Sequence, residues 1–253
     1  MSDSSEMERW KGRVALVTGA SSGIGRATAL ELGRAGMKVA VCARRDGPLR
    51  ELEAELGASE LLPLVADLRR EDDIGRLFTT LRERWGGVDV LVNNAGLGHA
   101  ASLLSGSTEE WREMLEVNVL ALCVCTREAL SDMFRRGDDG HVVHISSMAA
   151  HRVPSGSGVY SATKYAVRAL TEALRQELRE RDSAIRVSAI SPGYVETGFA
   201  EHYHKSAEAA EHTYGRYKVL EAGDIARAVR FVLASPPHMQ VHDILIRPRD
   251  QPG

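Results

Sequence analysis

The chain has 253 residues, of which 43% are hydrophobic and 26% are charged, and its formal net charge is −3. This composition is typical of a globular protein and argues against a disordered or fibrous chain. Such a small net charge gives no strong attraction for nucleic acid or for an anionic membrane surface. No apolar stretch reaches the ~18 residues of a membrane span, so we expect neither nucleic acid nor a membrane as a partner.

The start of the chain is polar and acidic, without the basic and apolar segments of a secretory signal. We expect residues 1–8 to form a disordered lead and the protein to be cytoplasmic. The three cysteines, Cys42, Cys123 and Cys125, fit no disulfide pattern. No cysteine or carboxylate cluster accompanies the histidines of residues 202–212, so no metal site is expected.

Apolar runs without polar alternation recur along the chain and are separated by helical patterns. Such runs are typical of strands covered on both faces of a parallel sheet. We therefore predict an α/β fold: residues 9–253 form a single doubly wound (Rossmann) domain with a seven-stranded parallel sheet flanked by helices, in the strand order 3-2-1-4-5-6-7. The expected strands are 13–18, 38–43, 61–66, 88–93, 141–147, 185–191 and 241–246, and the expected helices 24–36, 46–56, 71–85, 108–136, 159–182 and 224–234.

Residues 194–220 interrupt this alternation and contain several aromatic residues but few aliphatic ones. Long connections in compact domains are often functional, so we interpret this segment as a lid over the substrate. A surface helix packed on its own domain is the alternative. The aromatic residues are Tyr194, Phe199, Tyr203, Tyr214 and Tyr217.

A glycine-rich turn follows the first expected strand and leads into a helix-forming sequence. It reads Thr18-Gly19-Ala20-Ser21-Ser22-Gly23-Ile24-Gly25. Glycines allow the backbone to turn sharply and to approach a pyrophosphate, and the N–H groups at a helix N-terminus bind that anion. The turn therefore predicts a dinucleotide cofactor. Its glycines are separated first by three residues and then by one, whereas the ordinary fingerprint has the one-residue spacing first.

Tyr160 and Lys164 lie four residues apart and so share one face of the expected helix. Ser147 ends the apolar run that precedes them, so the strand end and the helix can converge on one substrate oxygen. A free tyrosine titrates near pH 10. We expect the ammonium of Lys164 to lower the pKa of Tyr160, which would make this tyrosine a proton donor and acceptor at a carbonyl or alcohol oxygen.

These motifs and three others resemble those of the short-chain dehydrogenase/reductase family, over residues 8–249. The others are Asn93-Asn94-Ala95-Gly96, Asn118, and Pro192-Gly193 with Thr197. The resemblance implies hydride transfer between a nicotinamide cofactor and a carbonyl or secondary alcohol. It also implies a homodimer or homotetramer formed through the two long helices.

The resemblance gives each catalytic residue a role. Tyr160 exchanges a proton with the substrate oxygen, and Ser147 holds that oxygen. Lys164 also holds the cofactor ribose, and Asn118 positions a water that connects Lys164 to solvent. The expected catalytic residues are Asn118, Ser147, Tyr160 and Lys164, and the expected substrate contacts are Ser147, Tyr160, Tyr194 and Phe199.

The end of the second expected strand favours NADP(H) over NAD(H). Ala43 stands where an acidic residue usually binds the ribose hydroxyl of NAD, and Arg44 and Arg45 follow. A guanidinium binds a phosphate through a two-pronged contact; the alternative is that both arginines are solvated and paired with Asp46 or Glu51. Asp67 is expected to meet the adenine, to cap the next helix, or both. The expected cofactor contacts are Gly19, Ser21, Ser22, Gly23, Ile24, Gly25, Arg44, Arg45, Asp67, Leu68, Asn94, Ala95, Gly96, Tyr160, Lys164, Pro192, Gly193, Val195 and Thr197.

Further stretches resemble an animal branch of the family to which insect farnesol dehydrogenases are related. This branch implies NADPH-dependent reduction of ketones, including steroid ketones. Residues 154–159 are shorter and richer in glycine than in that branch and are expected to flank the substrate, so the substrate class does not transfer from it. Bacterial reductases of aldehydes and hydroxy amino acids share the C-terminal pattern and stay open as alternatives. The resembling stretches are 7–10, 103–108, 139–141, 151–153, 174–180 and 243–248.

Two other functions remain as alternatives. A reductase of carrier-bound 3-oxoacyl groups is expected to need a basic patch for its acidic carrier protein; Arg135, Arg136 and Arg152 are candidates, although acidic residues are interspersed with them. A dinucleotide-binding sensor without turnover would not need all four catalytic residues.

Overall fold

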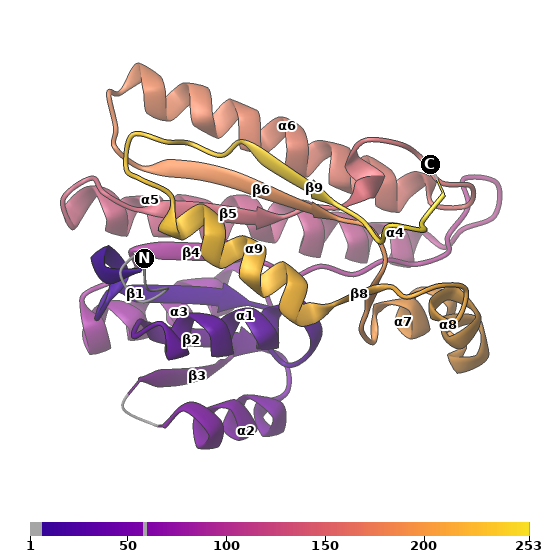
Figure 1. Cartoon of the computed structure of the whole chain (residues 1–253), viewed down its shortest axis with the longest axis horizontal. Coiled ribbons are helices and arrows are strands. Elements are labelled where there is room, and N and C mark those ends of the chain that lie inside the picture. The colour runs from indigo at the N-terminus through magenta and orange to yellow at the C-terminus, as the bar shows by residue number, and fades with distance from the viewer. Residues whose placement is uncertain (1–6, 58–59, 253) are drawn as a thin grey trace.

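The computed structural model describes residues 7–57 and 60–252. Its main feature is a seven-stranded, wholly parallel sheet with helices on both faces (Figure 1). The strand order β3-β2-β1-β4-β5-β6-β9 confirms the predicted order. The strands are β1 (Val14–Thr18), β2 (Lys38–Ala43), β3 (Leu61–Val65), β4 (Val90–Asn93), β5 (His141–Ile145), β6 (Arg186–Pro192) and β9 (Asp243–Ile246).

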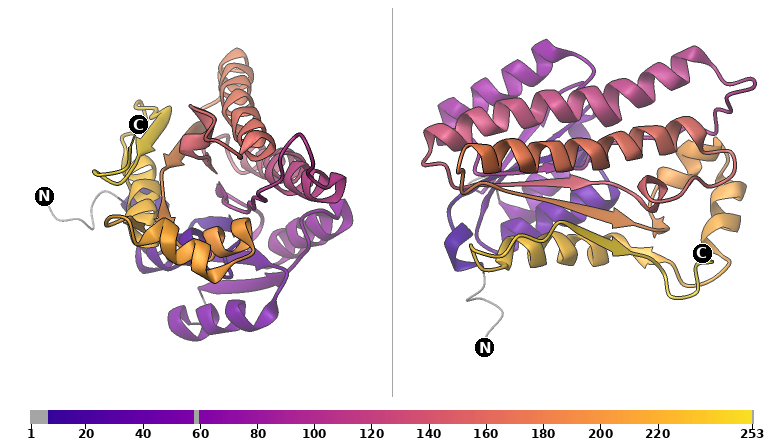
Figure 2. Two further views of the ribbon diagram at one scale, coloured as in Figure 1. Left: turned by 90° about the vertical axis from the view of Figure 1, so that its right-hand side faces the viewer. Right: turned by 90° about the horizontal axis from the view of Figure 1, so that it is seen from above.

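Two helical layers cover the sheet, and Figure 2 shows them on its two sides. Helices α1, α2 and α9 bury their apolar side chains on one face, and α3, α5 and α6 on the other. The helices are α1 (Gly23–Arg34), α2 (Asp46–Leu56), α3 (Glu71–Trp85), α4 (Thr108–Leu115), α5 (Ala121–Arg135), α6 (Gly158–Glu180), α7 (Phe199–His204), α8 (Ala207–Tyr214) and α9 (Ala222–Ala234).

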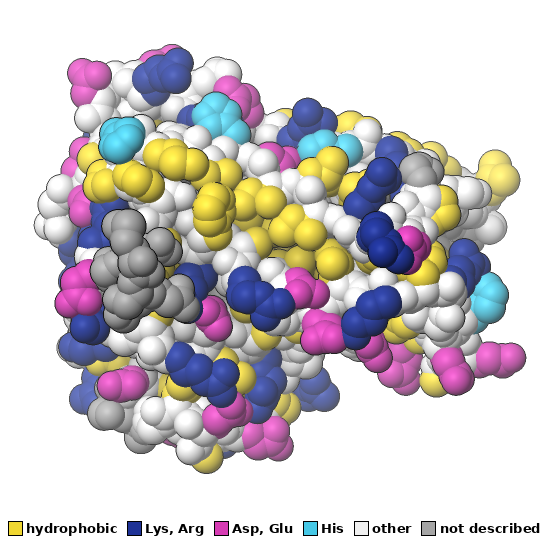
Figure 3. All heavy atoms as spheres, viewed as in Figure 1, with side chains coloured by type: hydrophobic (Ala, Val, Ile, Leu, Met, Phe, Trp, Pro, Cys, Tyr) yellow, Lys and Arg dark blue, Asp and Glu magenta, His cyan; other side chains and the backbone are white. Residues whose placement is uncertain are grey.

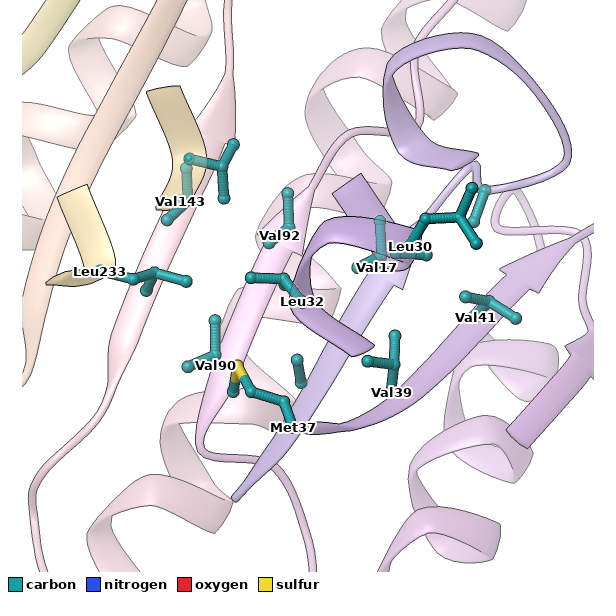
Figure 4. Close-up of a cluster of buried hydrophobic side chains, with 14 of the residues drawn as sticks. Val17, Leu30, Leu32, Met37, Val39, Val41, Val90, Val92, Val143 and Leu233 are labelled. Atoms are coloured by element: carbon teal, nitrogen blue, oxygen red, sulfur yellow. The ribbon is translucent and has the colours of Figure 1, made fainter. Parts of the chain in front are cut away.

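Side chains of the central strands are buried on both faces, as the lack of polar alternation predicted. Val17, Val39 and Val92 point toward α1 and meet Leu30 and Leu32 there (Figure 4). Complete burial of such a side chain contributes about 1.5–3 kcal/mol. The layers therefore hold the strands in register and bring their carboxyl ends to one edge.

The chain before β1 is more ordered than predicted. Met7 is only 2% exposed, and Glu8–Trp10 form a short 3-10 helix, η1. Trp10 is fully buried and donates a hydrogen bond from Nε1 to the Leu233 carbonyl at 2.8 Å. The predicted disordered lead is therefore too long at residues 7 and 8, while residues 1–6 lie outside the described residues.

Two segments differ from the predicted elements. The expected helix 108–136 is divided into α4 and α5 by a π-helical turn, η2 (Glu116–Leu120). Residues 194–220 contain α7 and α8 and also a small parallel pair, β7 (Val195–Glu196) with β8 (Leu220–Glu221), which the sequence did not predict. No helix in the described ranges is long and apolar enough to cross a membrane.

Candidate active site

A cavity of about 1050 Å³ opens at the carboxyl ends of the strands. Helices α7 and α8 lie in front of this edge in the left view of Figure 2. Every predicted cofactor contact except Gly25 lines the cavity, and so do all four predicted substrate contacts. Of the predicted catalytic residues, only Asn118 does not line it. The folding of the sheet thus brings together motifs that are far apart in sequence.

The glycine turn packs tightly against the chain that follows β4. Gly19 has a positive φ of 67°, which favours glycine. A Cβ atom on Gly25 would lie 2.4 Å from the Asn94 side-chain nitrogen, and one on Gly19 would lie 2.8 Å from the Ala95 Cα. Asn94 donates hydrogen bonds from Nδ2 to the carbonyls of Thr18 at 2.8 Å and Gly19 at 3.1 Å. The Asn94 amide therefore fixes the shape of the turn, in addition to lining the cavity.

The turn leads directly into α1, whose first residue is Gly23. Ser22 occupies the N-cap position, and its side chain makes no capping hydrogen bond in the described chain. The first N–H groups of α1 are therefore available to an anion, and the helix dipole favours one. Gly23 also has a positive φ of 54°, which lets the backbone enter the helix close to the cavity.

At the end of β2, Arg44 and Arg45 are exposed and line the cavity. Arg44 lies 3.8 Å from a Glu113 carboxylate oxygen, so its partner is neither Asp46 nor Glu51. Because its side chain is 59% exposed, this ion pair is screened and weak. Arg44 can therefore turn toward another anion at little cost.

Asp67 follows β3 and is held by its neighbour Arg69, with an Nη2–Oδ2 distance of 2.5 Å. Hydrogen bonds from Arg69 hold the pKa of the Asp67 carboxyl below its usual range. The N-cap of α3 is Arg70, so the prediction that Asp67 caps this helix is wrong. Asp67 remains at the cavity wall as a carboxylate.

Asn118 lies in the π-helical turn η2 and is 1% exposed. Its Nδ2 donates to the Leu97 carbonyl at 2.8 Å and to Thr163 Oγ1 at 3.0 Å, while its Oδ1 accepts from the Leu97 N–H at 2.9 Å. The side chain is thus occupied in joining the β4–α4 loop to α6. π-turns are frequent at functional sites, and this one marks a position that sequence periodicity had read as plain helix.

Ser147 and Tyr160 meet at the cavity wall. Ser147 is the N-cap of a short 3-10 helix, η3 (Met148–Ala150), and its Oγ accepts a hydrogen bond from the Ala149 N–H at 3.0 Å. Burial raises the pKa of Tyr160 to about 12, and a hydrogen bond with Ser147 opposes that rise. The pKa of Tyr160 is therefore raised and not lowered as the sequence predicted, with desolvation of the phenol as the largest cause.

Lys164 is 6% exposed and donates a hydrogen bond to the Ile145 carbonyl at 3.1 Å. Its Nζ lies 5.9 Å from the centre of the Tyr160 ring. Burial lowers the pKa of Lys164 to about 8, so it is mainly a cation at pH 7. A Cβ atom on Gly96 would lie within 3.5 Å of this Nζ and 3.4 Å of Asn118 Oδ1, so a glycine here keeps that space open.

Two rings of α7 pack on the predicted catalytic tyrosine. Phe199 and Tyr203 lie 5.4 and 6.1 Å from the Tyr160 ring, measured between centroids. All three rings meet over Gly98, where a Cβ atom would approach each within 3.0 Å. Tyr203 also donates from its hydroxyl to the Gly156 carbonyl at 3.2 Å, so α7 is also tied to the loop that precedes α6.

Several cavity residues were not predicted from the sequence. They belong to none of the motifs, and only the folded chain brings them to the cavity. The clearest signal was the aromatic content of residues 194–220, which included Tyr203 without assigning it to the substrate. The missed lining residues include Leu97, Met148, Arg152, His202, Tyr203 and Gln251.

The three arginines considered for a carrier-protein surface do not form one patch. Arg135 and Arg136 lie at the far end of α5 and are paired with Asp132 and Asp89, whereas Arg152 lines the cavity. On the face shown in Figure 3, basic and acidic side chains are interspersed.

Comparison with known proteins identifies the class to which this fold and site belong. Residues 13–208 match the short chain dehydrogenase family. The chain therefore belongs to the short-chain dehydrogenase/reductase family of oxidoreductases, as the motifs indicated.

Individual relatives match over nearly the whole chain. Dehydrogenase/reductase SDR family member 11 of Bos taurus is 53% identical, covering 97% of this chain and 99% of the relative. Farnesol dehydrogenase of Aedes aegypti is 42% identical, with coverage of 96% and 98%. The predicted resemblance to this branch is confirmed.

Solved structures of the family are also similar. The closed form of serine dehydrogenase complexed with NADP+ matches with a TM-score of 0.90 and 34% identity, covering 95% of this chain and 96% of that one. An actinorhodin polyketide ketoreductase variant with NADPH matches with a TM-score of 0.81 and 30% identity, covering 97% of each chain.

Proposed function

We propose that this protein is an NADP(H)-dependent reductase of ketones or aldehydes, which transfers hydride between nicotinamide and a carbonyl or secondary alcohol. The observation that carries the proposal is the meeting of Ser147 and Tyr160, beside the buried Lys164, in the cavity that begins at the glycine turn. The close contacts at Gly19 and Gly25 and the open N-terminus of α1 fit a pyrophosphate. When bound, the nicotinamide supplies or accepts the hydride.

The chain's own residues handle the proton. Because burial raises the pKa of Tyr160 to about 12, its phenol is protonated at neutral pH, which is the form that reduction requires. Tyr160 donates this proton to the carbonyl oxygen, and the Ser147 hydroxyl donates a hydrogen bond to the same oxygen. The Lys164 cation stabilises the phenolate that remains. Asn118, with its side chain occupied, joins the loop and helix that hold these groups.

The preference for NADP(H) rests on Ala43 and on the exposed guanidinium of Arg44. A charge-assisted hydrogen bond contributes roughly 1.5–3 kcal/mol, enough for about a tenfold preference or more. Replacing Ala43 with Asp and Arg44 with Ile is expected to move the preference toward NADH. Equal catalytic efficiency of the wild-type enzyme with NADH and NADPH would refute the assignment.

We further propose that residues 194–220 act as the substrate lid. Phe199 and Tyr203 reach Tyr160 across the cavity, a position from which they exclude water from the path of the hydride. The substrates in the names of the similar proteins, farnesol and serine, differ widely in polarity, so the lid and residues 154–159 are the places where specificity is expected to differ.

The test is NADPH oxidation across ketosteroids, terpenoid aldehydes, quinones and short polar ketones, together with a 3-oxoacyl group free and attached to its carrier protein. Turnover of a free carbonyl compound supports the proposal, and turnover only of the carrier-bound group favours the carrier-protein reductase. Binding of NADPH without turnover of any substrate would indicate a sensor. Size-exclusion chromatography with light scattering tests the expected homodimer or homotetramer.

A further inference from the structure

One charged residue of the cavity is not used by the proposed mechanism. Arg152 lies five residues after Ser147, in the connection from β5 to α6, and its side chain lines the cavity. Its Nε is buried and has no hydrogen-bond partner, and no salt bridge to Arg152 occurs in residues 7–57 and 60–252. The side chain as a whole is only partly buried, but an Nε–H buried without a partner costs free energy, which an anion bound at this guanidinium would recover.

The backbone around Arg152 is firmly held, so its position is part of the fold. His151 Nε2 lies 3.1 Å from an Asp243 carboxylate oxygen and 3.2 Å from Ser191 Oγ, which ties this turn to β6 and β9. The Arg152 N–H donates to the Met148 carbonyl at 3.2 Å. Two residues further on, the Pro154 carbonyl accepts from Ser157 Oγ at 2.7 Å. The turn that carries Ser147 therefore also presents Arg152 to the cavity.

The surrounding charges leave Arg152 without compensation. Asp67 is the only acidic residue among those that line the described cavity, and it is engaged by Arg69. It belongs to the predicted adenosine side, whereas Arg152 shares the Ser147 side. The cavity lining also includes apolar and aromatic side chains, among them Leu97, Met148 and Phe199. A single guanidinium in such a wall is arranged to select one negative group on a largely apolar ligand.

On these grounds, and resting on the proposed reductase function, we propose that Arg152 binds the carboxylate of the substrate, so that the substrates are oxo acids: compounds with an aldehyde or ketone at one position and a carboxylate at another. A planar guanidinium binds a carboxylate through two parallel hydrogen bonds. The carboxylate is unchanged in the reaction. Hydride from NADPH forms the new C–H bond, the Tyr160 proton goes to the carbonyl oxygen, and the products are a hydroxy acid and NADP+.

The experiment compares ω-oxo carboxylates of increasing chain length with their methyl esters, which keep the carbonyl but lose the charge. NADPH oxidation is followed for the wild type, Arg152→Gln and Arg152→Lys. The quantity of interest is the ratio of kcat/KM for acid to ester within each protein, because that ratio does not depend on the fraction that is correctly folded. Arg84→Gln, an exposed arginine on α3, is the matched control.

The wild type is expected to prefer the acid at one or more chain lengths by about tenfold or more, the size of a charge-assisted hydrogen bond. Arg152→Gln should bring the acid-to-ester ratio of kcat/KM close to one, through a higher KM for the acid. Arg152→Lys should keep part of the preference because the charge remains, and Arg84→Gln should keep all of it. Salt should reduce the acid preference of the wild type.

An acid-to-ester ratio that is the same in the wild type and Arg152→Gln overturns this proposal. Turnover of the esters without any preference for the acids also overturns it, although the reductase function then stands. If neither acids nor esters nor the wider carbonyl panel is reduced, the proposed function itself fails.

Discussion

The two halves of the cavity are built in different ways. The predicted cofactor side is shaped mainly by backbone: the glycine turn and the N-terminus of α1 pack against the Asn94 side-chain amide with almost no free space. The predicted substrate side is shaped by side chains from α7 and from residues 148–158, held by ring contacts and a few hydrogen bonds. A site made of backbone binds the part of a ligand that never varies, whereas a site made of side chains can change from one relative to another without altering the fold.

The largest expected effect falls where the two halves meet, at Tyr160. Tyr160→Phe removes the transferable proton and should lower kcat by about 10²- to 10⁴-fold, with NADPH affinity close to that of the wild type. Stopped-flow or steady-state NADPH oxidation measures the rate, and fluorescence titration measures cofactor binding. Tyr165→Phe, half-exposed on the same helix, is the control and should be near wild type. A Tyr160→Phe enzyme that retains most of its turnover would mean that another group donates the proton.

The second prediction concerns the glycine turn, on the side of the cavity that is shaped mainly by backbone. A methyl group at Gly25 would meet Asn94 Nδ2 at 2.4 Å and the Gly19 carbonyl at 2.5 Å. Gly25→Ala should therefore lower the free energy of unfolding by about 1–3 kcal/mol and weaken NADPH binding as well. Thermal unfolding with and without NADPH measures both effects. Gly75→Ala in α3 has nothing within 4 Å of the added carbon and should be stabilising; similar behaviour of the two variants would contradict the tight fit.

A methyl group at Gly98 tests the side of the cavity that is shaped by the side chains of α7. It would lie 2.8 Å from a Tyr203 ring carbon and 2.9 Å from a Phe199 ring carbon. Gly98→Ala should push α7 away and lower kcat/KM about tenfold, with NADPH affinity little changed. Adding Phe199→Ala removes one of these contacts, so the double variant should recover part of the activity relative to Gly98→Ala alone. If cofactor affinity falls as much as turnover, the two halves are not separable.

A further expected effect is a pH dependence of stability. Burial lowers the pKa of Lys164 from 10.5 to about 8, so between these values the unfolded chain binds a proton that the folded chain does not. The free energy of unfolding therefore rises with pH between these two pKa values. Lys164→Met should be stabilised relative to wild type at pH 7, and this gain should shrink from about pH 8 to above 10.5. Denaturant titrations across that range measure it; a gain that does not change with pH would show that burial of the charge is not its cause.

The fold was largely predictable because each of its determinants is local. Runs such as those of β1 and β4 are apolar at every position, which is required of strands covered on both sides. Right-handed crossovers then leave few possible topologies. Where a local pattern is ambiguous, the prediction was less accurate: the π-turn at Asn118 has the same apolar periodicity as the helices around it, and β7 and β8 are too short to leave a pattern.

By itself, the sequence determined the sheet, the glycine turn and the positions of Ser147, Tyr160 and Lys164, because spacing along the chain becomes position in a regular element. Only the tertiary structure decided the environment of those groups. Desolvation, which depends on everything packed around a side chain, raises the pKa of Tyr160 and lowers that of Lys164. The packing of Tyr203 on Tyr160 and the buried Nε of Arg152, which has no hydrogen-bond partner among the described residues, likewise depend on contacts between distant segments, which no motif records.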